Sequence, residues 1–461
     1  MNRIETAASD PRRSGWSVLG LRRDEIGPVL VATLFFFCVL TALMLLRPAR
    51  DALGMEHSLD SLRGLIVVTA LVTLAVNPLF GWLVGRLTRL QLVSATYGFF
   101  VLSLVGFWSL MRFAPGAAGR AGSQAFFVWF SVFNLFVTLV FWALLTERFT
   151  REQGLRLFSL VSIGGTSGAI FGPWLTLRLA GPLGTATLLL VAGGFLLLGL
   201  LAAWLLLQIT PDRAAGAGVA TALNEGAAGR IGGSAWAGIG SVFRSPYLGA
   251  IACYVMLMAA MATFVYFARL QMVAAIAHDV DARAAMLGHI DLWTHIAVLV
   301  LQLSLRGRLV ERFGLGVALA ILPVATAIGF VGLAIHGSVA VLVLLEAITR
   351  AVQRGITQPA REALFTGVAR EDQYKAKAFI DTFLYRSGDV VGAQAERALG
   401  GPGPAMGGLF GIALPLALAW VALALWLGRR ERPRSTPWRQ AAPRISDAAN
   451  RHPESHERTP A

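Results

Sequence analysis

The segment Gly27–Arg47 reads GPVLVATLFFFCVLTALMLLR and holds no charged residue before its final arginine. A helix of about 20 residues is about 30 Å long, which matches the hydrocarbon thickness of a bilayer. Inside hydrocarbon every backbone amide and carbonyl must be hydrogen-bonded within the protein, so an isolated apolar run of this kind forms a helix rather than a strand. The segment therefore predicts a transmembrane helix.

Runs of similar length and character recur along the chain. Beside Gly27–Arg47 we expect helices at roughly 64–84, 90–112, 125–146, 157–179, 184–209, 247–269, 286–305, 315–336, 338–357, 378–399 and 406–428. The 461 residues are 56% hydrophobic and 14% charged, whereas about 25% of residues are charged in ordinary soluble domains. We therefore predict an all-α, polytopic membrane protein with about twelve transmembrane helices.

Short sequence repeats relate the first six predicted helices to the last six. Gly81–Arg86 and Gly307–Arg312 share the pattern G-x-L-V-x-R, and Arg151–Arg156 and Arg370–Lys375 share R-E-x-x-x-[R/K] at matching places. Such internal similarity is typical of transporter folds built from two related halves.

The repeats predict a layout of five parts. These are an N-terminal segment (1–26), a first six-helix half (27–209), a linker (210–246), a second six-helix half (247–428) and a disordered tail (429–461).

The basic residues predict the orientation. The formal net charge is +14, but the arginines sit mostly in short loops between apolar runs, not along one basic stripe. Loops rich in Arg and Lys stay in the cytoplasm, and placing the N-terminus there puts most of the 40 basic residues on that side. We expect both termini to be cytoplasmic, a bacterial inner-membrane location, a monomer, and no nucleic-acid partner.

Several motifs resemble those of a known family. The loop at Gly81 is similar to the G-x-x-x-D-R-x-G-R-R loop of the major facilitator superfamily, with Gly85 in place of its Asp. Other segments resemble the bacterial ATP:ADP antiporter, or nucleotide exchange, family: Arg47–Asp51 (RPARD), Phe133–Phe136 (FNLF), Arg156–Phe158 (RLF), Arg361–Phe365 (REALF), Tyr374–Asp381 (YKAKAFID) and Tyr385–Asp389 (YRSGD). The resemblance implies a carrier with the major facilitator fold that exchanges nucleotides.

One position departs from that family pattern. True nucleotide exchangers carry a Lys just after an Arg-x-Gly sequence, where this chain has Asp389. A carboxylate would repel a phosphate, so the resemblance implies the fold and a carrier role more firmly than it implies ATP.

Charged residues inside predicted helices are candidates for the solute site, because a charge in the membrane is costly unless it is paired or used in transport. Glu346, Arg350 and Arg354 fall on one stripe of the helix at 338–357. The stripe predicts a cavity face where an arginine binds an anionic group. Alternatively, Glu346 and Arg350 form an ion pair that only fixes helix packing.

Four further groups of polar residues are candidates. Arg386 and Asp389 are three residues apart and can pair with each other or with solute. Asn134 can contact a base or sugar, or form a hydrogen bond between helices. Arg47 and Arg50, at the outer end of the first helix, can form a gate that attracts anions, or extend to the lipid headgroups. Asp291 and His295 lie four residues apart and are candidates for proton coupling; the alternative is a polar patch near the outer mouth.

The basic and acidic loops on the predicted cytoplasmic side are candidates for a gate that breaks when the carrier opens inward. They contribute Arg86, Arg151, Glu152, Arg156, Arg370, Glu371 and Lys375.

Glycines recur every fourth residue in the helix at 157–179, at Gly164, Gly168 and Gly172. A phosphate-binding loop would need a Gly-Lys-[Ser/Thr] ending, which is missing, so the spacing predicts a close helix contact. We find no motif for a catalytic residue, a metal or a cofactor, and we expect no enzymatic activity.

The sequence thus predicts a transporter that works by alternating access on a small-molecule solute in the lipid bilayer. A nucleotide or related phosphorylated anion is the first hypothesis. A proton-coupled carrier or exporter of another small organic solute is the second, and a non-transporting membrane sensor or scaffold is the third.

Overall fold

The computed structural model describes residues 22–56, 58–114, 116–210, 237–304, 314–365, 376–377, 379–399 and 406–430. In these ranges the chain is helical apart from short turns, as a backbone without access to water requires. The first half contains α1 (Arg23–Gly54), α2 (Leu59–Arg86), α3 (Arg89–Phe113), α4 (Ala117–Arg148), α5 (Arg151–Leu183) and α6 (Thr187–Ile209).

After the short helix α8 (Ala237–Arg244), which lies within the predicted linker, comes the second half. It contains α9 (Pro246–Ile276), α10 (Val280–Ser304), α12 (Leu315–His336), α13 (Val339–Val352), the π-helical turn η2 (Gln353–Thr357), α14 (Gln358–Phe365), the π-helical turn η3 (Ile380–Leu384), α16 (Tyr385–Leu399) and α17 (Met406–Arg430).

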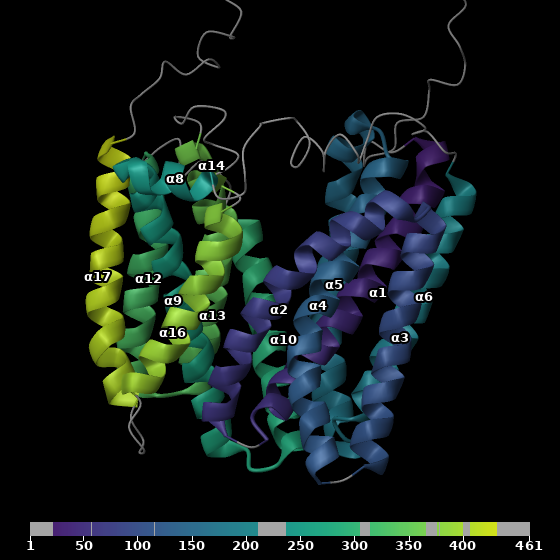
Figure 1. Ribbon diagram of the computed structural model, residues 1–461, viewed down its shortest axis with the longest axis horizontal. Helices are drawn as coiled ribbons and strands as arrows, with labels where there is room; N and C mark the ends of the chain where they lie inside the picture. The colour runs from purple at the N-terminus through teal and green to yellow at the C-terminus, as the bar shows by residue number, and fades with distance from the viewer. Residues whose placement is uncertain are drawn as a thin grey trace, which may run out of the picture.

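Ten helices in the described ranges are long and apolar enough to cross a membrane, and the prediction of an all-α polytopic membrane protein is confirmed. Two further segments run alongside them, α13 with η2 and α14, and η3 with α16 (Figure 1). These two carry several charged residues and each contains a π-helical turn, a feature that occurs frequently at functional sites.

Several predicted helix boundaries were wrong, usually where the predicted helix ends at a charged residue. α1 continues past Arg47 to Gly54, α9 continues past Arg269 to Ile276, and α2 begins before Arg63. The helix predicted at 338–357 continues through η2 and α14 to Phe365. Arg269 and Arg63 pair with carboxylates on other helices, and Arg47 borders a cavity, so these helices continue through their charged residues.

The helices form two bundles with matching internal contacts, seen at the two sides of Figure 1. α1 packs on α5 and α3 on α6 in the first bundle; α9 packs on α16 and α12 on α17 in the second. Most of the predicted linker and tail, and the repeats at Gly307 and Arg370, lie outside the described residues. The five-part division of the chain therefore stays a prediction.

The α1–α5 contact confirms the prediction made from the glycine spacing. A Cβ on Gly168 would lie 2.5 Å from the Phe37 carbonyl oxygen, and one on Gly164 would lie 2.2 Å from that of Thr33. Only glycine allows the two backbones to approach this closely. α9 and α16 repeat the arrangement, since a Cβ on Gly388 would lie 2.7 Å from Met256 O.

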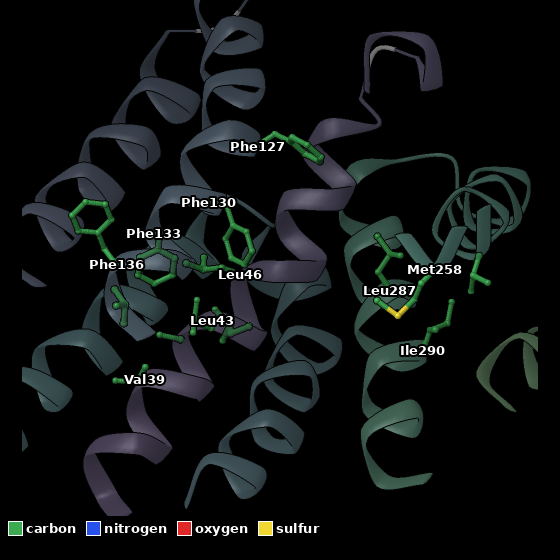
Figure 2. Packing of buried hydrophobic residues seen from close by; sticks show 14 of the residues in the cluster. Val39, Leu43, Leu46, Phe127, Phe130, Phe133, Phe136, Met258, Leu287 and Ile290 are labelled. Carbon is green, nitrogen blue, oxygen red and sulfur yellow. The ribbon is translucent and has the colours of Figure 1, made fainter. Parts of the chain in front are cut away.

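Apolar side chains fill the interior of each bundle. Figure 2 shows Leu43 and Leu46 of α1 beside Phe130 and Phe133 of α4, and all four are buried. This packing holds α1 in place, so that the charged residues at its end reach the boundary between the halves.

The two halves meet through α1 and α5 against α10, and through α2 against α16. Helices α1, α9 and α16 all end at the bottom of Figure 1. We call this end of the bundle the distal end and the opposite end the terminal end. A Cβ on Gly288 of α10 would lie 3.0 Å from Pro173 O of α5, so the backbones of the two halves are in close contact there. These contacts lie toward the distal end.

Candidate functional site

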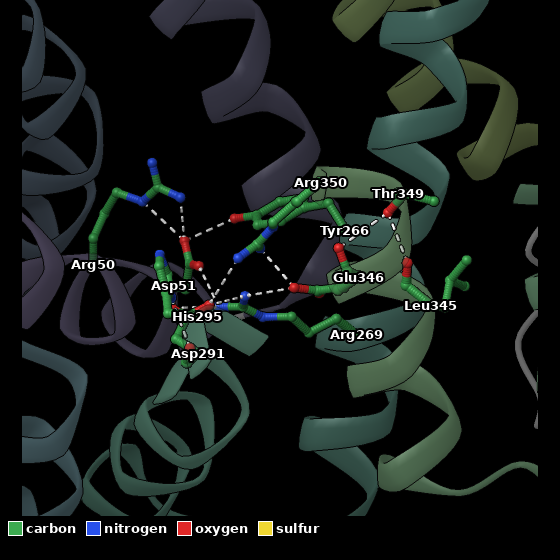
Figure 3. Close-up of polar contacts among 10 residues, drawn as sticks. All are labelled: Arg50, Asp51, Tyr266, Arg269, Asp291, His295, Leu345, Glu346, Thr349 and Arg350. Atoms are coloured by element: carbon green, nitrogen blue, oxygen red, sulfur yellow. Dashed lines mark hydrogen bonds and ion pairs between the residues drawn. The ribbon is translucent and has the colours of Figure 1, made fainter. Parts of the chain in front are cut away.

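Asp51, in the last turn of α1, lies between the halves and is fully buried. From the same half, Arg50 donates Nη2 and Nε to Asp51 Oδ1 at 2.5 and 2.8 Å. From α9 of the other half, the Tyr266 hydroxyl donates to Asp51 Oδ1 at 2.9 Å, and Arg269 Nη2 donates to Asp51 Oδ2 at 3.3 Å (Figure 3). A single carboxylate thus binds both halves together.

Arg269 extends the contact into the second half. Its side chain is 0% exposed, and it donates to Asp291 of α10 at 2.7 Å. Its Nη1 also lies 3.6 Å from Glu346 of α13. A buried guanidinium needs compensating carboxylates, and here they come from three helices.

Arg350, one helical turn after Glu346, belongs to this network and also lines a cavity. Its Nη2 donates to Glu346 Oε2 at 2.6 Å, while Nη1 lies 3.7 Å from Asp291 Oδ1 and has no hydrogen-bond partner among the described residues. The sequence predicted a choice between an ion pair and a cavity-facing arginine, and the structure shows both in one residue, because the side chain also lines a cavity.

The charges of this network do not cancel. The buried or half-buried groups are the guanidiniums of Arg47, Arg50, Arg269 and Arg350, and the carboxylates of Asp51, Asp291 and Glu346. Four cations thus face three anions. Arg47 has no ion pair with any described residue. An unbalanced buried positive charge is unfavourable unless an anion or water reaches it.

Three neighbouring pockets, which share lining residues and which we call the lobes of one cavity, lie beside the network. The first lobe, of about 160 Å³, is lined by Arg47 from the first half and by residues of the second half, including Tyr266, Glu346, Arg350, Gln353 and Trp420. The second, of about 210 Å³, shares Ala262 and Tyr266 with the first; its lining includes Arg50, Ser131, Thr263, Arg386 and Asp389. The third shares Met258 and Gln353 with the first.

The predicted site residues therefore divide into two groups. Arg47, Glu346 and Arg350 border the first lobe, and Arg50, Arg386 and Asp389 border the second. Arg386 donates to Asp389 at 3.3 Å, the pairing expected from their spacing. Arg354 and Asn134 are exposed and line none of the three lobes.

The proposed proton-coupling pair has a different geometry from that expected. His295 Nδ1 lies 2.7 Å from the backbone oxygen of Asp291 rather than from its carboxylate. The carboxylate is bound by Arg269, and both residues are buried. A proton-coupling role for the two stays a prediction.

The predicted cytoplasmic gate is only partly within the described residues. Arg156 pairs with Glu25 at 2.9 Å inside the first half, and the exposed Arg86 lies over the Trp82 ring at 4.7 Å. Glu152 is exposed, and Arg151 begins α5. Arg370, Glu371 and Lys375 lie outside the described residues, so the gate across the halves stays a prediction.

Sequence reasoning did not identify Arg269, Arg63 and Glu396 as site residues. Arg63 of α2 donates to Glu396 of α16 at 2.6 and 2.8 Å, a second buried ion pair between the halves. All three charges lie at or near the ends of the predicted helices 64–84, 247–269 and 378–399. The mostly apolar run LQMVAAIA (Leu270–Ala277) directly after Arg269 was the signal that the helix continues.

Comparisons with solved structures identify the fold. A bacterial homologue of the human lysosomal transporter Spinster, in an inward-facing and unoccupied conformation, is 13% identical, with a TM-score of 0.51 over 89% of this chain and 96% of that one. A variant of the nucleoside transporter NupG is 14% identical, with a TM-score of 0.55 over 87% and 98%. The peptide transporter POT in complex with sulfate is 15% identical, with a TM-score of 0.60 over 87% and 95%.

No protein-family model matches the sequence, and the search of curated proteins finds no match. Fold and composition together define the class: an all-α, polytopic membrane protein with the major facilitator type of fold. The solved structures support this fold and do not support the ATP:ADP antiporter family in particular.

Proposed function

We propose that the protein is a membrane transporter that carries a small anionic solute by alternating access between its two halves. One observation carries the proposal: the cavity between the halves is bordered by a network of four arginines and three carboxylates. An anion that enters the first lobe balances the remaining positive charge and supplies a partner for Arg350 Nη1.

The positive-inside rule supports cytoplasmic termini in a bacterial inner membrane. In that orientation the distal end faces outward, and the Asp51–Arg269 and Arg63–Glu396 contacts close it. The structure then corresponds to an inward-facing state. The carrier acts as a monomer, with the solute bound near the midplane where the halves meet, and needs no catalytic group.

Within this class, the resemblance of RPARD, REALF and YRSGD to the nucleotide exchangers supports a nucleotide or another phosphorylated anion as the solute. The nucleoside and peptide transporters share only the fold. A second candidate, a proton-coupled carrier of another organic solute, is supported by Asp389, a partly exposed carboxylate in the second lobe.

Uptake into proteoliposomes tests the proposal. Purified protein should take up a labelled nucleotide when the vesicles contain unlabelled nucleotide, and without a pH gradient. Flux of nucleotide that requires a proton gradient would favour the second candidate. If neither nucleotides nor simpler organic anions cross under either condition, the proposed function is wrong.

A further inference from the structure

The third lobe of the cavity has no role in the anion site described above. It has a volume of about 310 Å³ and lies within the second half, on the terminal side of Arg350. It is lined by Gln353, Thr357, Gln358, Arg361, Asp381 and Tyr385.

We infer that this lobe is a second subsite for the same solute, which binds a neutral planar group with a hydrogen-bond donor beside an acceptor. The edge of a nucleobase and a peptide amide share this chemistry. The inference rests on the proposed function, because the anionic part of the solute would occupy the first lobe.

Arg361 and Asp381 present one unused donor and one unused acceptor. Arg361 Nη2 lies 3.4 Å from Asp381 Oδ1, but Arg361 Nε and Asp381 Oδ1 are both buried without a hydrogen bond to any described residue. Leaving such groups unpaired costs about 1–3 kcal/mol each, more for charged groups. A planar group that accepts from Nε and donates to Oδ1 would satisfy both at once.

Two glutamine side chains add further donors and acceptors. The Gln353 amide donates only weakly, to the Met258 sulfur at 3.9 Å, and Gln358 is exposed. Both carboxamides can bond the same edge of a neutral ligand, whereas neither carries a charge to attract an ion. Tyr385, half-buried beside them, offers an aromatic ring as a further contact surface.

The two π-helical turns bring these residues together around the third lobe. η2 contributes Gln353 and Thr357, and η3 contributes Asp381 with Tyr385 directly after it. From Arg350 to Gln358 the chain advances eight residues, which is roughly 12 Å at about 1.5 Å per residue. A solute that reaches both lobes therefore needs a separation on the order of 10 Å between its anionic and neutral groups, so a bare inorganic anion is too short.

Calorimetry on the full chain in lipid nanodiscs tests the subsite with matched probes. Uridine 5′-monophosphate is compared with ribose 5-phosphate, and N-acetyl-aspartyl-glycinamide with butyrate. In at least one pair the member with the base or amide should bind about tenfold more tightly, the gain expected from two net hydrogen bonds. The pair that shows the gain identifies its source, nucleobase or peptide.

Arg361→Met and, separately, the exposed Gln358→Leu should reduce that gain to threefold or less, while ribose 5-phosphate and butyrate bind as before. Gln302→Leu, an exposed glutamine of α10 outside the three lobes, should retain the full gain. Equal affinity within both pairs, or a gain that survives both variants, would overturn the subsite alone. Absence of binding by all four probes would overturn the proposed function as well.

Discussion

Arg350 belongs both to the buried network and to the cavity, and this double position defines its role. One nitrogen is bound to Glu346 at 2.6 Å, and the other has only a longer contact with Asp291 at 3.7 Å. A guanidinium in this state can accept an anion from the cavity without first losing its structural partner.

Replacing Arg350 should therefore impair transport more than it impairs folding. We expect Arg350→Gln to lower the initial rate of anion uptake into proteoliposomes at least tenfold, because the cavity loses its positive excess. Arg350→Lys should retain an intermediate rate, since a lysine keeps the charge but loses the planar donor pair.

The control is Arg178→Gln, which removes an exposed arginine from α5. It should transport as the wild type does. Uptake by Arg350→Gln at the wild-type rate, with the same preference among anions, would show that Arg350 serves packing only.

At the scale of the helices, close contact between backbones holds each half together. α1 and α5 approach through Gly164, Gly168 and Gly172, and α9 and α16 through Gly388 and Gly392. These pairs occupy equivalent places in the two halves. The glycines therefore fix the position of α1, whose end carries Asp51, and of α16, whose end carries Glu396.

A methyl group at this contact should be destabilising. In Gly168→Ala the new Cβ would meet the Phe37 oxygen at 2.5 Å and Thr41 N at 3.0 Å, both backbone atoms. We expect a loss of about 1–3 kcal/mol, visible as a lower midpoint of thermal unfolding in detergent. Gly194→Ala, where the added Cβ would have no described residue of another helix within 4 Å, is the matched control and should unfold as the wild type does. Equal midpoints for the two variants would contradict the close-contact interpretation.

The sequence predicted the helices and the glycine contact because both depend on local patterns. Runs of apolar residues give the helices, and a four-residue glycine spacing gives a flat helix face. It did not predict that Arg269 pairs with Asp51, 218 residues away. A charge near a predicted helix end looks the same whether it extends to water or pairs with another helix, and only the packing distinguishes the two.

At the scale of the whole molecule, the ion pairs and hydrogen bonds between the halves gather at the distal end. The Arg63–Glu396 pair is almost fully buried, and Thr185 of the first half donates to Asp281 of the second at 2.6 Å. The proposed alternating access requires these contacts to break, so in that mechanism their strength sets the balance between the inward- and outward-facing conformations.

Removing Glu396 should shift that balance. Spin labels at Ala118 and His278, both exposed at the distal end of opposite halves, report their separation once Cys38 and Cys253 are replaced by serine. In Glu396→Gln we expect a longer distance to appear or grow, because Arg63 loses its charged partner across the boundary.

Arg89→Gln provides the comparison, because it breaks the Arg89–Glu147 ion pair within the first half. The distance distribution should then match that of the unsubstituted parent. A distribution in Glu396→Gln that is indistinguishable from the parent would mean that this pair does not hold the distal end closed.

The polarity of α16 also affects how the chain is made. Its 15 residues include Arg386, Asp389, Glu396 and Arg397, and the first two lie toward the centre of the segment formed by η3 and α16, where a charged residue costs about 2.5–3.5 kcal/mol on insertion. Their partners lie on helices synthesised earlier: Arg63 on α2 and Thr263 on α9. We therefore expect those helices to stay near the translocon until α16 emerges from the ribosome. In a glycosylation-reporter assay, α16 should fail to integrate as an isolated segment and should integrate when the preceding chain is present.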